Sequence, residues 1–129
     1  MKSLRIAVQM DPIESMVVNH DTSLALMVEA QTRGHELWWF TPNDLFYELG
    51  AVKARSRRVS VSFDEKQHYD THETAVRTVN EFDVVLVRQD PPFDMGYISN
   101  TYLLELAKTV VINPPRGIRN ISEKTSILV

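Results

Sequence analysis

The stretch TSLALMVEAQTRGHELWWF, residues 22–40, places a helix pattern, a glycine and a strand pattern in direct succession. Apolar side chains recur every three to four positions in its first half, which predicts a helix that runs to Arg33. Asp21 or Thr22 can cap the start of this helix. Gly34 stands where helices commonly end on a left-handed residue, and the apolar run after it predicts a strand.

Three further apolar segments extend this pattern on both sides. Residues 4–10 precede the helix and predict a first strand, which makes a strand–helix–strand unit and favours a parallel sheet. The continuous apolar run at 84–88 is typical of a buried central strand, and 110–112 predicts a last strand after a helix over 98–108. We therefore expect an α/β fold, Rossmann-like in outline, with a mainly parallel sheet and flanking helices.

The segment between the second and third parallel strands follows a different pattern. A short helical turn is predicted to start at 41–44, to run through 45–47 and to end at Gly50. The segments 51–56 and 57–63 follow, and side chains alternate between polar and apolar over 58–63. That alternation predicts an antiparallel hairpin or meander inserted into the α/β pattern. Residues 64–73 are polar and predict a loop, and 74–80 fit either a strand end or one helical turn.

The bulk composition excludes several classes of protein. A chain of 129 residues suggests one domain. The net charge of −3 gives no basic field for nucleic acid, and no apolar run approaches the roughly 18 residues of a membrane span. The chain has no cysteine, so disulfides and thiolate chemistry are absent, as fits a cytoplasmic protein.

Glycine placement excludes two nucleotide-binding motifs. The chain has four glycines, and none follows the spacing of a dinucleotide-binding loop or a P-loop. The turn after the first strand therefore lacks a phosphate cradle, which argues against a dehydrogenase or a P-loop enzyme.

Charged residues follow two of the predicted parallel strands. Asp11 comes after the first strand, and Arg88 and Asp90 come after the run at 84–88. Open α/β sheets bind ligands beyond the carboxyl ends of their strands, and an arginine there can hold a carboxylate through two hydrogen bonds. Two alternatives remain open: Asp11 belongs to an ordinary Asp-Pro turn, or Arg88 and Asp90 form a structural pair that closes the sheet.

Other polar and aromatic residues carry weaker signals. His68 and His72 have a zinc-compatible spacing if the segment is helical, but it lacks an apolar face, so we predict no metal site. The arginines around Arg57 are typical of a guarded, exposed strand edge. Trp38 and Trp39 are interpreted as one core residue and one half-exposed residue.

Three segments together resemble one protein family. They are MDPIESM (10–16), VRQDPPFDMGYISNTYLLELA (87–107) and VINPPRGIRNISEK (111–124). The sequence resembles the N-terminal domain of prokaryotic glutathione synthetase over nearly its whole length. The resemblance implies a pre-ATP-grasp domain over residues 1–129 that binds substrate, with the chain ending as a linker helix to an ATP-grasp region begins.

The resemblance also implies an activity for the complete protein. Such an enzyme is an ATP-dependent carboxylate–amine ligase of glutathione biosynthesis, which joins γ-glutamylcysteine to glycine with ATP and Mg²⁺ through an acyl phosphate. It is cytoplasmic and forms homo-oligomers. No catalytic residue is implied within this chain, and the fragment alone is expected to be inactive.

The resemblance assigns roles to four residues. It implies that Asp11, Arg88 and Asp90 form one wall of the peptide site. It implies that Lys124, which by its position alone is an ordinary surface lysine, contacts ATP. The family often has lysine where this chain has Gln89, so a charge at that position is missing here.

Two other functions are compatible with the same features. One is a free-standing, non-catalytic ligand-binding or assembly module with the pre-ATP-grasp fold. The other is a related ATP-grasp ligase that uses a different acid and amine.

Overall fold

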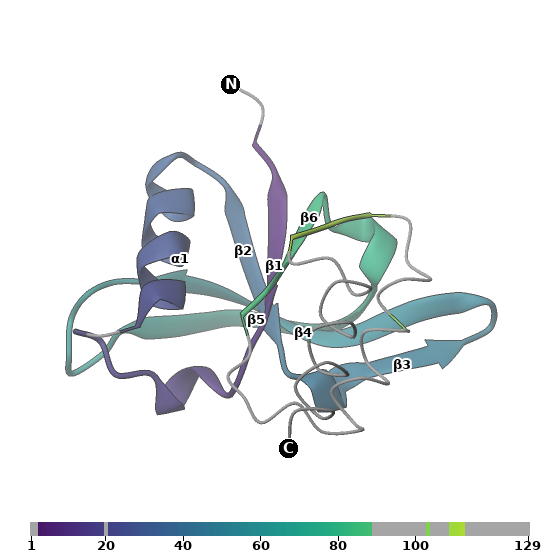
Figure 1. The fold of residues 1–129 in the computed structure, drawn as a ribbon, viewed down its shortest axis with the longest axis horizontal. Helices are drawn as coiled ribbons and strands as arrows, with labels where there is room; N and C mark the ends of the chain where they lie inside the picture. Colours follow the sequence, from purple (N-terminus) through teal and green to yellow (C-terminus); the bar gives the residue numbers. More distant parts are fainter. Residues whose placement is uncertain (1–2, 20, 89–102, 104–108, 113–129) are drawn as a thin grey trace, which may run out of the picture.

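The computed structural model describes residues 3–19, 21–88, 103 and 109–112. Seven strands form one sheet in the order β3-β4-β2-β1-β6-β7, with β5 paired to β4 outside that path (Figure 1). In chain order the elements are β1 (Arg5–Gln9), η1 (Ile13–Ser15), α1 (Thr22–Thr32), β2 (Glu36–Phe40), η2 (Pro42–Asp44), β3 (Leu45–Glu48), β4 (Ala51–Val61), β5 (Tyr69–Thr78), η3 (Val79–Glu81), β6 (Val84–Val87) and β7 (Val110–Ile112).

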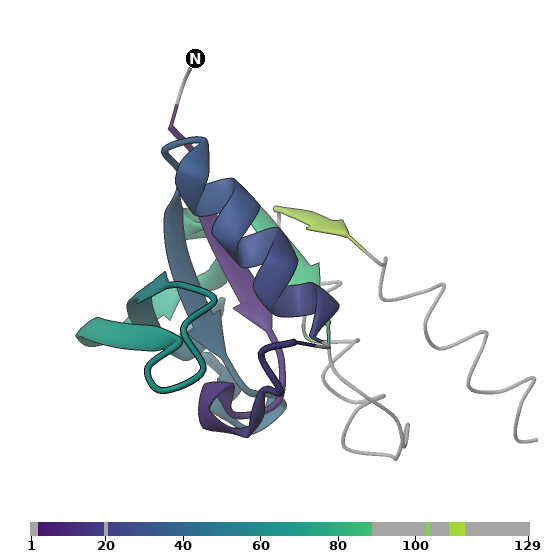
Figure 2. The same cartoon turned by 90° about the vertical axis from the view of Figure 1, so that its left-hand side faces the viewer.

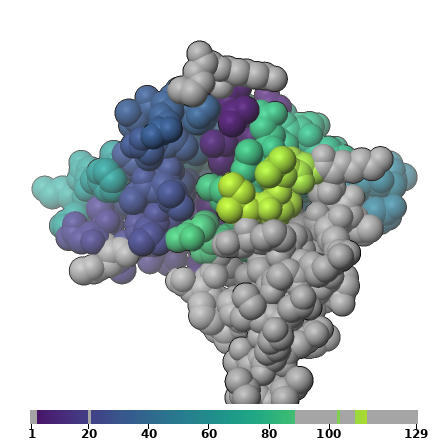
Figure 3. All heavy atoms as spheres, turned by 45° about the horizontal axis from the view of Figure 1, so that its top comes forward, coloured from purple at the N-terminus to yellow at the C-terminus, as the bar shows by residue number. Residues whose placement is uncertain are grey.

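The parallel part of the sheet agrees with the sequence-based prediction. β1 pairs in parallel with β2 and with β6, and β6 pairs in parallel with β7. Figure 3 shows β7 at the molecular surface beside β6. Of the helix expected over 98–108 the structure describes Leu103, which is helical and packs against the core. The helix expected to start at Asn120 or Ser122 lies outside the described residues.

Helix α1 also forms as predicted. The Asp21 carboxylate accepts hydrogen bonds from the backbone N–H groups of Ser23 (2.8 Å) and Leu24 (3.1 Å), which satisfies two free donors of the first turn. Gly34 ends the helix with φ of +87°. Figure 2 shows α1 lying across one face of the sheet. Among the described residues, no helix is long and apolar enough to cross a bilayer.

The antiparallel part corrects two predictions. Residues 51–61 form one continuous strand, β4. The predicted helical turn forms only at its start, as η2, and Leu45–Glu48 form strand β3 where the turn was expected to continue. β3 pairs with the first half of β4, so its backbone groups are satisfied across the sheet. Leu49 and Gly50 both have positive φ, at 52° and 81°, and close this hairpin as a two-residue turn.

Strand β5 is a further correction, because the polar residues before Thr74 were expected to form a loop. β5 begins at Tyr69 and pairs with β4 along its whole length, with one register shift at Arg58 and Val59. Backbone pairing rather than burial holds this strand, since most of its side chains are exposed. Residues 74–80, which fitted either a strand end or one helical turn, contain both: β5 continues to Thr78, and the 3-10 helix η3 follows it.

The sheet has a buried cluster on each face. The cluster under α1 contains Leu24, Met27 and Trp39, and the cluster on the other face contains Trp38 and Phe82. Trp39 is 5% exposed and Trp38 is fully buried, so the prediction of a half-exposed tryptophan is wrong.

The arginines of β4 also differ from the prediction. Strands β2 and β5 flank the segment around Arg57, which therefore does not lie on a free edge. The guanidinium of Arg57 lies 4.6 Å from the ring centre of Trp39, as a cation–π contact.

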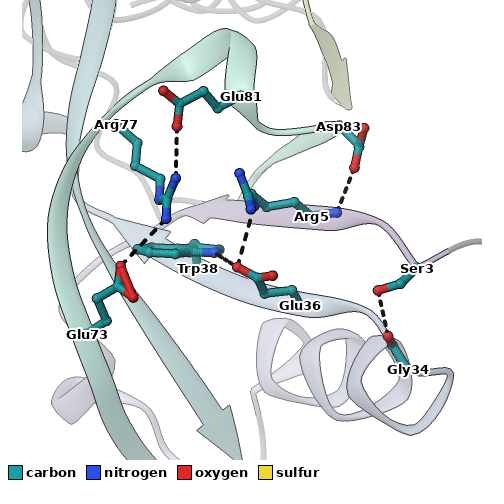
Figure 4. A network of polar contacts seen from close by, with 9 residues as sticks. All are labelled: Ser3, Arg5, Gly34, Glu36, Trp38, Glu73, Arg77, Glu81 and Asp83. Carbon is teal, nitrogen blue, oxygen red and sulfur yellow. Dashed lines mark hydrogen bonds and ion pairs between the residues drawn. The ribbon is translucent and has the colours of Figure 1, made fainter.

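A polar network lies on the face of Trp38 (Figure 4). The indole Nε1 of Trp38 donates to Glu36 Oε1 (2.6 Å), which also lies 3.4 Å from Arg5 Nε. The guanidinium of Arg77 lies 4.4 Å from the ring centre of Trp38 and forms ion pairs with Glu73 and Glu81. This network covers the tryptophan ring with charge and satisfies its N–H.

Candidate functional site

The carboxyl ends of three parallel strands meet at one edge of the sheet. Met10 N donates to Phe40 O (3.0 Å), and Arg88 N donates to Gln9 O (2.8 Å), so backbone bonds tie the end of β1 to the ends of β2 and β6. The β1–β6 register places Asp11 and Arg88 just beyond the ends of neighbouring strands. The structure therefore brings together two of the predicted site residues at the edge where open α/β sheets bind ligands.

The side chain of Arg88 is held against the start of α1. Its Nη2 donates to Thr22 Oγ1 (2.6 Å), and its Nε donates to Ser23 Oγ (3.3 Å). Both partners are hydroxyl groups, so these bonds orient the guanidinium without neutralising its charge. Sequence patterns did not indicate these partners, because they lie far from Arg88 along the chain, at the start of α1. Asp90, the predicted partner of Arg88, lies outside the described residues.

The segment after Asp11 is fixed by the connection between β4 and β5. His68 is 9% exposed, and its Nε2 donates to Ile13 O (2.7 Å). Asn19 Nδ2 donates to Glu65 Oε1 (2.6 Å), which makes a second link between the same two segments. Asp11 itself is exposed. A hairpin distant in sequence thus sets the position of the first candidate loop.

The two histidines do not act together. His72 hydrogen-bonds the exposed hydroxyl of Ser60 (2.6 Å), whereas His68 bonds the backbone of the β1–α1 segment. No group of three His, Cys, Asp or Glu side chains gathers within the part of the chain that the structure describes.

A cavity of about 330 Å³ opens between the β1–α1 segment and strands β2, β4 and β5. Trp39 and Arg57 form part of its wall, and Glu14 reaches it from η1. Hydroxyl groups of Thr41, Thr71 and Thr74 also line it. Sequence reasoning missed this cavity, because its walls come from strands whose register was not predictable.

Asp44 fixes the arginine of this cavity. Its Oδ2 accepts hydrogen bonds from Arg57 Nη1 (2.9 Å), Thr41 N (2.8 Å) and Thr41 Oγ1 (3.0 Å). Burial acts to raise the pKa of the Asp44 carboxyl, but the hydrogen bonds from Arg57 and Thr41 outweigh burial and hold the pKa below its usual value. Asp44 is therefore a carboxylate at neutral pH and keeps Arg57 in place.

Two features that commonly hold nucleotide phosphates or Mg²⁺ are missing from the described residues. The segment between β1 and α1 has no glycine, and the carboxylates described are not grouped for a metal. Lys124, the residue expected to contact ATP, lies outside the described residues.

Comparison with known proteins decides the family. The family model of the prokaryotic glutathione synthetase N-terminal domain matches residues 4–119. The chain belongs to this family. The match confirms the resemblance seen in the three sequence segments, and it confirms the α/β pre-ATP-grasp fold, because the observed sheet is mostly parallel with an antiparallel insertion.

Proteins named glutathione synthetase are similar over almost the whole chain. The one from Brucella melitensis is 47% identical over 124 residues, which cover 95% of this chain and 40% of the relative. The one from Rhodopseudomonas palustris is 41% identical over 128 residues, covering 98% of this chain and 41% of the relative. The one from Wigglesworthia glossinidia brevipalpis is 38% identical over 128 residues, covering 97% and 40%. The glutathione synthetase domain described here thus spans about 40% of the length of these relatives.

Proposed function

We propose that this domain forms one wall of the peptide-substrate site in an ATP-dependent ligase that joins γ-glutamylcysteine to glycine. The family match over residues 4–119 carries the proposal. The geometry of Arg88 supports it, because two hydroxyl bonds hold the guanidinium ready at a strand end before a ligand arrives.

In this proposal Arg88 binds a carboxylate of the peptide, and Asp11 and Asp90 orient the same substrate. These residues position the peptide and take no part in bond formation. A guanidinium suits this task because it offers parallel N–H donors that match a carboxylate.

The proposal also covers ATP binding. Residues 1–129 act as a pre-ATP-grasp domain, and Lys124, which lies outside the described residues, contacts ATP near the entry to an ATP-grasp region. ATP and Mg²⁺ are then bound mainly by that region. The complete protein is proposed to act in the cytoplasm as a homo-oligomer.

The main test replaces Arg88 by alanine in the intact enzyme. We expect the KM for γ-glutamylcysteine to rise at least tenfold, the effect of losing a charge-assisted hydrogen bond, while the KM for ATP changes little. Arg33→Ala is the matched control, because that arginine is exposed and pairs only with Glu29 on α1 among the described residues. Small and equal changes in both KM values would return Arg88 to a structural role.

Two further measurements separate the alternatives. The 129-residue chain alone, given both substrates and ATP, is expected to release no ADP. Turnover of the intact enzyme with a panel of dipeptide acids and amines tests the related-ligase alternative, which predicts a better pair than γ-glutamylcysteine and glycine. An intact protein that turns over none of them supports the non-catalytic module.

A further inference from the structure

The cavity beside Trp39 presents both signs of charge within one small space. Arg57 lines it from β4, and Glu14 lines it from η1. Its volume of about 330 Å³ is at the lower end of the range for small-molecule sites. We propose that this cavity binds the α-ammonium and α-carboxylate of an amino-acid head group, with Glu14 facing the ammonium and Arg57 facing the carboxylate.

Arg57 is prepared to receive a carboxylate. Asp44 occupies its Nη1, and the face of Trp39 supports the guanidinium plane. Among the described residues, no hydrogen bond uses its Nε or Nη2. Those two nitrogens form the edge of a guanidinium that can donate two parallel hydrogen bonds to a carboxylate, and Thr71 and Thr74 of the cavity lining carry hydroxyl groups that can donate as well.

Glu14 is available for the opposite charge. It is exposed and has no hydrogen bond or ion pair to any described residue. Its loop is fixed, since the neighbouring Ile13 is fully buried and its carbonyl accepts the hydrogen bond from His68. The Glu14 carboxylate therefore lies at the cavity and makes no hydrogen bond or ion pair that stabilises the described part of the fold.

The charge pattern favours a zwitterion over a simple ion. A simple anion such as phosphate would meet the carboxylate of Glu14, and a simple cation would meet Arg57. A molecule with an ammonium and a carboxylate on one carbon satisfies both walls.

The inference rests in part on the proposed function, which supplies two molecules with this head group. One is the γ-glutamyl end of the peptide, and the other is glycine. The cavity lies on β2, β4 and β5, whereas Arg88 follows β6; in the sheet order β4 is three strands from β6, about 14 Å at ordinary strand spacing. Arg57 and Arg88 therefore bind different groups of the substrate, and we assign the cavity to the γ-glutamyl end of the peptide.

The experiment measures binding to the intact protein by calorimetry, so it does not depend on turnover. The ligands are γ-glutamylcysteine, glutarylcysteine, which lacks only the α-amino group, and glycine. For Glu14→Gln we expect affinity for γ-glutamylcysteine to fall about tenfold, the effect of one charge-assisted hydrogen bond, with no change for glutarylcysteine. Glu29→Gln is the control, since it removes the same charge from an exposed site on α1.

A second variant tests the other wall. Arg57→Lys keeps the positive charge beside Asp44 but loses the planar edge, so it should weaken γ-glutamylcysteine and glutarylcysteine alike. If both variants bind glycine more weakly and the peptide equally well, the cavity binds glycine and the assignment to the γ-glutamyl end is wrong. Unchanged affinity for all three ligands in Glu14→Gln, or equal losses for the peptide and its deaminated analogue, would overturn the assignment.

The outcome is separable from that of the proposed function. If peptide binding depends on Glu14 but the protein has no ligase activity, the head-group site is supported and the proposed ligase function is contradicted. If the protein has ligase activity but its peptide affinity does not depend on Glu14, the ligase function is supported and the head-group site is contradicted.

Discussion

Trp38 and Trp39 are adjacent in β2, point to opposite faces of the sheet and are each covered by an arginine, yet their surroundings differ. Trp38 donates its N–H to Glu36, and Arg77 above it lies between two glutamates. Trp39 has no described partner for its N–H, and it borders the cavity that Arg57 and Glu14 share.

The difference separates a structural arrangement from a site. On the Trp38 face the indole N–H is hydrogen-bonded and both guanidinium groups form ion pairs with glutamates, although Arg5 Nε and Arg77 Nε are buried without a hydrogen bond among the described residues. The charges on this face therefore compensate one another and stabilise the sheet. On the Trp39 face the indole N–H is buried without a described partner, and the Glu14 carboxylate lines an open cavity. Unsatisfied polar groups are costly to a fold, and they are retained where function needs them.

The largest contrast is expected from replacing each indole by a phenyl ring. Trp38→Phe should lower the free energy of unfolding by about 2 kcal/mol, because it removes packing volume and the hydrogen bond from the indole to Glu36. Trp39→Phe should cost about 1 kcal/mol, because its N–H has no described partner to lose. Urea denaturation of both variants measures the difference, and equal costs would remove the distinction between the two faces.

Asp44→Asn should cost about 1–2 kcal/mol of stability at neutral pH, because it removes a charge-assisted bond to Arg57. The folded pKa of Asp44 is lowered, so its contribution is complete above the ordinary value of about 3.8 and is lost as pH falls through the folded value. The stability gap between wild type and variant should therefore close only below pH 3.8. A gap that is constant from neutral to acid pH would contradict this role of the carboxylate.

The smallest effect is expected for the glutamates around Arg77. Glu73 and Glu81 are 43% and 44% exposed, so Glu73→Gln and Glu81→Gln should each change stability by less than about 0.5 kcal/mol. Added salt should weaken even that contribution. If either variant costs as much as Asp44→Asn at moderate salt, the closed face depends on its ion pairs more than its exposure indicates.

The parallel half of the fold could be predicted because its signals are local. Continuous apolar runs mark β1, β2 and β6, the Asp21 cap and Gly34 mark the limits of α1, and the crossover rule supplies the pairing. Asp11 and Arg88 were each predicted to follow a strand of this sheet, and the observed pairing of β1 with β6 makes the two strand ends neighbours.

The alternating pattern predicted that the insertion is antiparallel, but its strand limits and register could not be predicted, because long-range pairing decides them. Most side chains of β5 are polar and exposed, so nothing in its sequence separates it from a loop until β4 supplies the backbone partners. The cavity depends on the same pairing, which sets Arg57 opposite both Trp39 and Thr74. The sequence pattern therefore predicted an edge position for Arg57, whereas the structure places it between two strands and in the wall of the cavity.

The position of β1 between β2 and β6 has a consequence for synthesis. The ribosome makes β1 first, and β2 follows soon, but the other neighbour of β1 is made only after the entire antiparallel insertion. Until then the nascent chain presents the unpaired edge of an apolar strand, a feature that promotes aggregation. The length of the insertion that builds the candidate pocket therefore also sets how long the nascent chain must be protected from aggregation through β1.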